Sequence, residues 1–169
     1  MSEKVTIRPA RAGDGAGLAA CWVDTGRYYA ELAPEHFRVP VVDGLDASFE
    51  EALSRPRSDD ELWLVAEVGG RVAGSVTARL QPPGERAERQ LVRRFGELRA
   101  LVDAIYVIGS HRRQGIGTLL LGAAEQWATG KGAVAVSLDT YVGSPLSIPF
   151  YEQRMGYYRR AIVFEKRLR

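Results

Sequence analysis

The sequence predicts one α/β domain of the α+β type, with a mixed sheet flanked by helices, across residues 1–169. The length and the 46% hydrophobic composition suit a single globular core. Strand-like and helix-like stretches follow one another along the whole chain, without a repeat, a low-complexity tract or a linker. Residues 100–142 read as strand, helix and strand, and such a crossover predicts two parallel strands that are neighbours or near-neighbours.

The N-terminal part predicts a strand and a helix. Residues 5–10 alternate in polarity and end at a proline, as a short strand does. We expect the next helix to begin with Asp14 as its N-cap. Three apolar side chains then share one helical face: Leu18, Cys21 and Trp22.

An irregular segment, a helix and a hairpin should come next. Residues 27–44 mix aromatic residues, prolines and charges, so they predict no regular element. Residues 46–55 predict a short helix. Residues 61–80 predict a hairpin that turns at Gly69 and Gly70, because both glycines accept a positive φ.

The C-terminal half predicts further alternation of strands and helices. The expected elements are a loop with a short charged helix (81–99), a strand (100–108), a loop and a helix that stops near the C′ glycine Gly130, a strand (133–142), a short helix (144–156) and a last strand (157–168).

Composition excludes several classes of function. A net charge of +2, from 23 basic and 21 acidic residues, gives no reason to expect a nucleic-acid partner. No apolar run is long enough to span a bilayer and the first ten residues contain no apolar signal region, so we expect a cytoplasmic protein without a membrane partner. Cys21, His36 and His111 are too scattered to predict a metal site, and Cys21 reads as a small buried hydrophobe.

The segment 111–118, His-Arg-Arg-Gln-Gly-Ile-Gly-Thr, is the strongest functional signal. The first amides of a helix lack intrahelical acceptors, and Gly115 and Gly117 let a bulky anion approach them. Arg112 and Arg113 can add charge-assisted hydrogen bonds. The spacing matches neither a Walker A loop nor G-x-G-x-x-G, which disfavours nucleoside triphosphates and nicotinamide cofactors.

Residues 100–158 resemble the acyl-CoA-binding core of the GNAT superfamily of N-acetyltransferases. Four consecutive stretches carry the resemblance: "IYV", "RRQGIG", "VSLDT" and "FYEQRMGY". The opening residues also look like the first strand and helix of that family. The resemblance implies a mostly antiparallel central sheet in which a splayed parallel strand pair binds CoA, and it implies acetyl-CoA as the acyl donor, with no metal.

The resemblance also implies roles for individual residues. The loop amides would hold the CoA pyrophosphate, and the preceding strand would pair with pantetheine. Ser144 stands where the family often has an asparagine that contacts the cofactor, and Tyr151 would be the general acid. Pro149 then belongs in the first turn of a helix that begins near Ser147. The loop and strand positions are Ile105, Tyr106, Val107, Arg113, Gln114, Gly115, Ile116, Gly117 and Thr118.

The implied reaction is direct attack of a primary amine, of a small molecule or a peptide, on the acetyl thioester. An amine with a pKa near 10.4 lies about 4.6 kcal/mol from its neutral form at pH 7. Asp103 and Asp139 are both placed to act as the base that removes this proton, and each is equally well explained as a solvated residue at a strand end. For Tyr151, the alternative to the general-acid role is a packing role.

Substrate recognition is expected in the irregular segment 27–44, where Glu31 and Glu35 offer negative charge. Surface solvation explains both glutamates as well. A non-catalytic acyl-CoA-binding module and an enzyme for a different acyl-CoA stay open as alternatives. The open sheet edges and the apolar last strand also allow a homodimer.

Overall fold

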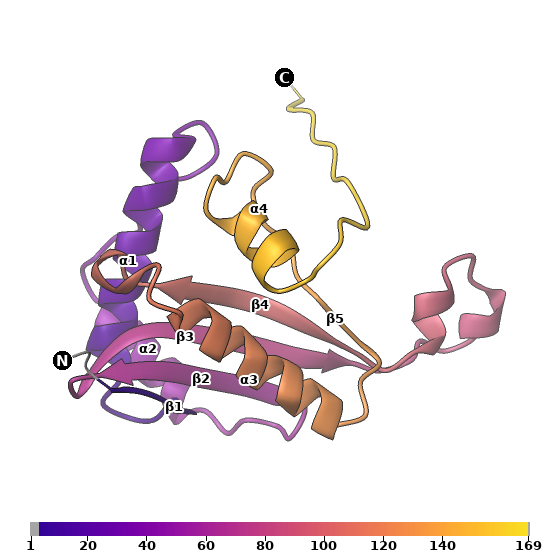
Figure 1. The fold of residues 1–169 in the computed structure, drawn as a ribbon, viewed down its shortest axis with the longest axis horizontal. Coiled ribbons are helices and arrows are strands. Elements are labelled where there is room, and N and C mark those ends of the chain that lie inside the picture. The colour runs from indigo at the N-terminus through magenta and orange to yellow at the C-terminus, as the bar shows by residue number, and fades with distance from the viewer. Residues whose placement is uncertain (1–3, 169) are drawn as a thin grey trace. The chain divides into compact units, whose positions relative to one another are not determined.

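The computed structural model describes residues 4–168, which divide into two compact units, one up to Leu138 and one from Asp139. In this part of the chain, the first unit holds a five-stranded sheet whose strands lie in sequence order (Figure 1). Every neighbouring pair is antiparallel except β4 and β5, which are parallel. The predicted mixed sheet is therefore confirmed. The strands are β1 (Val5–Pro9), β2 (Glu61–Val68), β3 (Arg71–Gln81), β4 (Arg99–Val107) and β5 (Ala135–Ser137).

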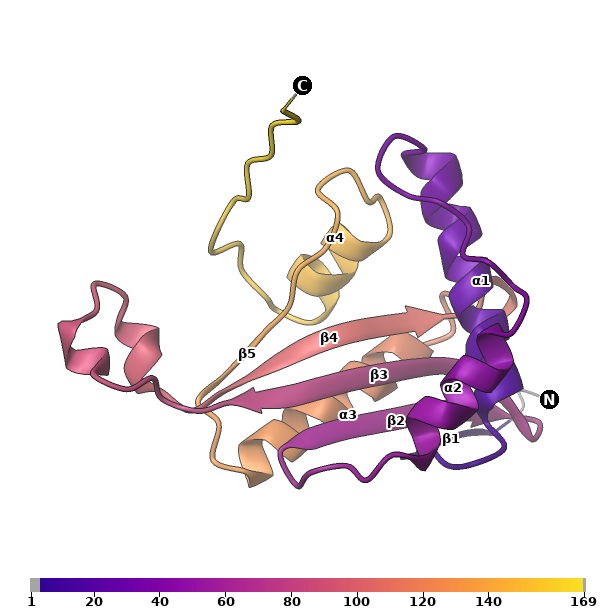
Figure 2. The same cartoon turned by 180° about the vertical axis from the view of Figure 1, so that it is seen from behind.

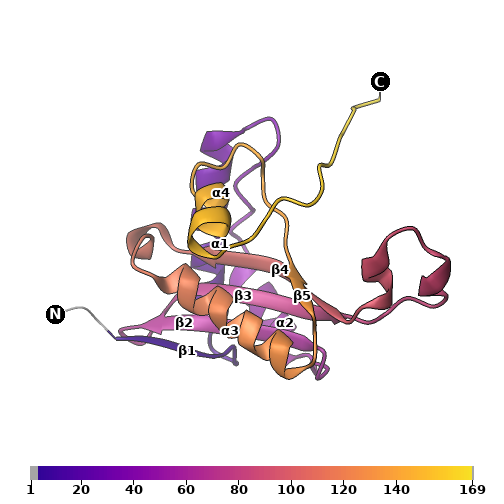
Figure 3. The ribbon, with the colours of Figure 1, turned by 45° about the vertical axis from the view of Figure 1, so that its right-hand side comes forward.

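Helices cover both faces of this sheet. Figure 2 shows α2 (Leu45–Ser54) in front of the strands beside α1 (Gly15–Leu32), and Figures 1 and 3 show α3 (Ile116–Gly130) across the opposite face. On the α1 side, Leu18 and Cys21 are buried against Val65 and Tyr106 of the sheet. The α3 side is closed by the buried residues of that helix: Ile116, Leu120, Leu121, Ala124 and Ala128.

The hairpin forms as the sequence predicts. β2 and β3 are joined at Gly69 and Gly70, whose φ angles are +55° and +74°. Two consecutive positive φ angles match the right-handed twist of the flanking strands, and glycine adopts them without strain.

Helix α1 is longer than expected, so the prediction of an irregular segment is wrong for residues 27–32. The ring of Tyr29 lies 5.2 Å from that of Tyr28 and 4.9 Å from that of Phe37. These ring contacts stabilise the last turns of the helix although the sequence lacks a clear apolar period there. The helix ends at Leu32 because Pro34 disfavours helical geometry at residue 33.

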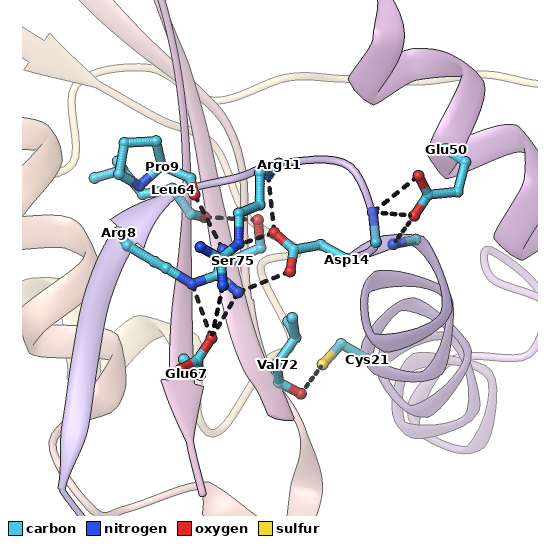
Figure 4. Close-up of polar contacts among 12 residues, drawn as sticks. Arg8, Pro9, Arg11, Asp14, Cys21, Glu50, Leu64, Glu67, Val72 and Ser75 are labelled. Atoms are coloured by element: carbon cyan, nitrogen blue, oxygen red, sulfur yellow. Dashed lines mark hydrogen bonds and ion pairs between the residues drawn. The ribbon is translucent and has the colours of Figure 1, made fainter. Parts of the chain in front are cut away.

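The N-terminus of α1 is capped by a residue that the sequence does not point to. Asp14 occupies the N-cap position, but its side chain makes no capping hydrogen bond and instead accepts two bonds from Arg8, each 2.8 Å long (Figure 4). Glu50 of α2 accepts the N–H of Gly13 at 3.0 Å and the N–H of Gly15 at 2.6 Å. A carboxylate from α2 therefore satisfies the amides at the positive end of α1.

Three shorter segments differ from the expectation. Residues 81–99 contain two single 3₁₀ turns, Ala87–Arg89 and Arg93–Gly96, in place of one short helix. The left-handed glycine after α3 is Gly132, with a φ of +82°, and not Gly130. The expected strand 133–142 is reduced to Ala135–Ser137, because only these residues pair with β4.

The second unit holds one helical segment. α4 (Ser147–Pro149) continues into a wider π-helical turn, Phe150–Arg154, so Pro149 lies in the first turn as expected. The predicted last strand is wrong, because no strand is present within residues 157–168. Ile162, Val163 and Phe164 are at least 80% exposed. β-prone residues become a strand only when their backbone groups find a partner strand. The prediction of one domain over 1–169 stays a prediction.

Candidate functional site

The edge of β4 that faces β5 is largely open within the first unit. β4 pairs with β3 along its whole length, but it pairs with β5 only from Arg99 to Leu101. The register with β3 shifts from Thr77–Ala104 to Ala78–Val102, which leaves Asp103 as an extra residue in a β-bulge. The bulge therefore lies just beyond the point where the two parallel strands separate.

The ladder geometry shows which backbone groups of β4 face this edge. The N–H of Ile108 donates to the carbonyl of Ala73 at 2.9 Å. Since hydrogen-bonded and non-bonded pairs alternate in an antiparallel ladder, Tyr106 exchanges its bonds with β3, and Ile105 and Val107 direct theirs away from it. The carbonyl of Val107 accepts the Nε–H of Arg112 at 2.9 Å, which agrees with this orientation.

The loop after β4 presents amides at the start of α3. Arg113 and Gly115 have φ angles of +63° and +86°, and α3 begins at Ile116. Leu119 donates the first intrahelical bond of the helix, to the carbonyl of Gly115. The N–H groups of the residues before Leu119 therefore have no intrahelical acceptor, and such amides can donate hydrogen bonds to an anion: Gly115, Ile116, Gly117 and Thr118.

The two arginines of this loop have different surroundings. The Arg112 guanidinium lies 2.5 Å from the Asp24 carboxylate and above the ring of Tyr28, with 5.1 Å to the ring centre. The same Asp24 oxygen accepts the N–H of Gly109 at 2.8 Å. Arg113 is exposed, and no carboxylate among residues 4–168 pairs with it. Of the two side chains, that of Arg113 is therefore the one available to an anion.

Asp103 lines a cleft on the α2 face of the sheet. Its carboxylate is 3.2 Å from the guanidinium of Arg79, and its side chain is 39% exposed. The cleft has a volume of about 400 Å³, and its walls come from four segments. They are the end of α2 with the residues after it, the start of β2, the end of β3, and the bulge of β4. Its lining residues lie within 52–63 and 77–79, together with Asp103, and none comes from the expected recognition segment 27–44.

Three further residues expected in the site belong to the second unit. Asp139 is its first residue. Ser144 is 2% exposed, and its hydroxyl donates to the Ser147 hydroxyl at 2.9 Å and accepts the Ser147 N–H at 3.1 Å. Tyr151 packs in the helical turn, with its ring 5.2 Å from that of Phe150 and 6.1 Å from that of Tyr157.

The sequence does not point to Asp24, Arg57 or Arg79. Asp24 is 88 positions from Arg112, so no local pattern connects them. The alternation of side chains along β2 and β3 does place Trp63 and Thr77 on one face of the sheet. This alternation is the only sequence feature that indicates a wall of the cleft.

The charged residues of the described chain form no group of three His, Cys, Asp or Glu side chains that could hold a metal ion. No helix within residues 4–168 is long and apolar enough to cross a membrane.

A mixed sheet with a bulged strand, an open parallel pair and a glycine loop at a helix start is the fold of an acyltransferase. The chain belongs to the GNAT acetyltransferase family, whose model matches residues 26–157. The resemblance read from the sequence is therefore confirmed.

Two curated proteins show where the similarity lies. The chain is 30% identical over 115 residues to acetyl transferase GW6a of Oryza sativa subsp. japonica, which is 63% of this chain and 26% of that protein. It is 42% identical over 48 residues to aminoglycoside N(6')-acetyltransferase type 1 of Klebsiella aerogenes, which is 28% of this chain and 32% of that protein. The matches thus span about a quarter to a third of each relative.

Solved structures share the fold over nearly the whole chain. A transcriptional regulator from Bacillus halodurans C-125 superposes with a TM-score of 0.70 and 23% identity, covering 98% of this chain and 100% of that chain. The aminoglycoside N-acetyltransferase AAC(6')-Iy in complex with CoA gives a TM-score of 0.64 and 20% identity, covering 99% and 98%. At this identity the comparison establishes the fold.

Proposed function

We propose that this protein transfers the acetyl group of acetyl-CoA to a primary amine of a small molecule or a peptide by direct attack. The observation that carries the proposal is the open edge of β4, which leads directly to the free amides at the start of α3. Family membership supports acetyl transfer. A protein of the same fold binds CoA, and a relative is an aminoglycoside acetyltransferase, which supports CoA as donor and an amine as acceptor.

The donor half of the site follows from the backbone geometry. The pyrophosphate would accept hydrogen bonds from the amides of residues 114–118, and the exposed guanidinium of Arg113 would add charge. The amides of pantetheine would pair with Ile105 and with the N–H of Val107, since the carbonyl of Val107 is bonded to Arg112. Tyr106 would form no backbone hydrogen bond with pantetheine, because its N–H and carbonyl are directed to β3. Ser144 stays a predicted contact.

The acceptor half needs a base and an acid. Asp103 would remove the amine proton through water from its position on the bulge, and Asp139 stays the alternative base. Tyr151 would donate a hydrogen bond to the departing thiolate. Full proton transfer from a phenol with a pKa near 10 to a thiolate whose acid has a pKa near 8.5 is uphill by about 2 kcal/mol, so the hydrogen bond is the larger contribution.

Calorimetric titration with CoA, followed by a thiol-release screen over amines, tests the proposal. We expect CoA to bind and at least one amine to release free CoA. Asp103→Asn should lower kcat with little effect on CoA affinity, and Asp139→Asn is its matched comparison. Burial raises the pKa of the Cys21 thiol to about 12, so the protein's own cysteine does not contribute to the signal.

CoA binding without turnover on any amine would favour the non-catalytic module. Absence of CoA binding at millimolar concentration would contradict the donor site itself. Cytoplasmic location, a homodimer, and the absence of a resident metal and of nucleic-acid and membrane partners stay predictions from the sequence.

A further inference from the structure

Two of the three arginines that line the cleft beside Asp103 are paired with carboxylates. Arg79 pairs with Asp103, and Arg55 pairs with Glu51 at 2.5 Å. Glu61 accepts the N–H of Ser58 at 3.3 Å. Arg57 is the remaining arginine of the lining, and a guanidinium without a carboxylate partner can bind a negatively charged group of a ligand.

The surroundings of Arg57 leave its guanidinium available to a ligand. Arg57 is half-buried, and its guanidinium lies above the ring of Trp63 at 4.9 Å from the ring centre. Within residues 4–168 no carboxylate pairs with it. A guanidinium stacked on an indole keeps its N–H groups free at the edge, where they can bind a carboxylate or a phosphate through two parallel bonds.

We propose that the acceptor is a primary amine that also carries a carboxylate or a phosphate group, with the anion bound by Arg57 and the amine directed to Asp103. This inference rests on the proposed function and names its substrate class. A volume of about 400 Å³ accommodates one small molecule of this kind. A polycationic amine would place like charges beside Arg57 and Arg79, so the cleft selects against the aminoglycosides on which a relative acts.

The experiment compares ω-amino acids from glycine to 6-aminohexanoate with the amide of each, using thiol release from acetyl-CoA. The series varies the distance between the amine and the carboxylate, so the test does not depend on knowing in advance how far Arg57 lies from the reacting amine. For the best length we expect kcat/KM to be at least about tenfold higher for the acid than for its amide, because one charge-assisted pair accounts for such a factor. ω-Aminoalkyl phosphates of the same lengths then distinguish a phosphate from a carboxylate.

Arg57→Gln should lower kcat/KM for the acid at least about tenfold more than for its amide, and Arg57→Lys should keep part of the preference for the acid. Arg71→Gln, an exposed arginine at the start of β3 and outside the cleft, is the matched control and should keep the full preference. If Arg57→Gln lowers kcat/KM equally for the acid and its amide, the proposal is overturned. Equal turnover of acids and amides by the unmodified protein would overturn it as well, while the proposed acetyl transfer would stand.

Absence of turnover with every amine would instead contradict the proposed function. Calorimetric titration of the same ω-amino acids into the protein then tests the anion site directly. Binding that Arg57→Gln weakens at least about tenfold supports the site. No binding, or binding that the substitution leaves unchanged, overturns it.

Discussion

At the residue scale, adjacent arginines in the glycine loop are used differently. The sequence presents Arg112 and Arg113 as equivalent donors to an anion. In the structure, Arg112 joins α1 to the end of β4, because it contacts Asp24 and the carbonyl of Val107. These contacts hold Arg112 against α1 and β4, and the side chain of Arg113 is the one that stays available to an anion.

This difference gives a first prediction. Asp24→Asn should raise the Kd for CoA about tenfold, since the loop loses the carboxylate that holds Arg112 and the N–H of Gly109. Calorimetric titration measures the change. Glu31→Gln, an exposed carboxylate on the same helix, is the control and should leave the Kd unaltered. A Kd for Asp24→Asn equal to that of the control would contradict the positioning role.

Tyr151 gives a second prediction at this scale. Tyr151→Phe should lower kcat and leave the affinity for acetyl-CoA nearly intact, because the hydroxyl acts only as the thiolate departs. The ring contacts with Phe150 and Tyr157 are retained in the variant. Tyr157→Phe removes the hydroxyl of a neighbouring tyrosine and serves as the comparison. Steady-state assays that show an unchanged kcat for Tyr151→Phe would remove the general-acid assignment.

At the scale of elements, the start of α1 depends on a residue from α2. Glu50→Ala should lower the free energy of unfolding by about 1 kcal/mol, because the amides of Gly13 and Gly15 lose their acceptor. Chemical denaturation measures the loss. Glu51→Ala removes an exposed carboxylate from the adjacent position and should cost less than about 0.5 kcal/mol. Equal losses in the two variants would contradict the capping role.

The sequence predicts the elements unequally well. The hairpin at Gly69 and Gly70 is correct, because backbone geometry at this turn depends on the glycines themselves. The strands 133–142 and 157–168 are too long or wrong, because a strand also needs a partner that sequence periodicity does not identify.

At the scale of the whole molecule, the buried ion pair of Arg8 and Asp14 links stability to pH. Burial alone would raise the pKa of Asp14, but hydrogen bonds from Arg8 and from the N–H of Arg11 outweigh it and lower the pKa below its usual value. The folded state therefore binds this proton less readily than the unfolded chain. The stabilisation is present above about pH 4 and is lost as the pH falls through the pKa of the folded state.

Asp14→Asn should cost about 2 kcal/mol at pH 7 and progressively less as the pH is lowered toward 3. Denaturant titrations of both proteins from pH 3 to pH 7 measure this difference. The double variant Arg8→Gln with Asp14→Asn should cost less than the sum of the two single variants, because both single changes remove the same ion pair. A cost that does not vary with pH would contradict the linkage.

The sequence by itself predicts the donor side of this protein. The glycine loop, the strand before it and the start of α3 are contiguous, so local turn chemistry suffices to predict an anion site, and the resemblance of these residues to known acetyltransferases predicts the family. The tertiary structure decides which arginine of the loop is free, which residue caps α1, and which side chains surround Asp103. Each depends on residues far apart in the chain, such as Asp24 with Arg112 or Arg57 with Asp103, and only packing brings such residues together.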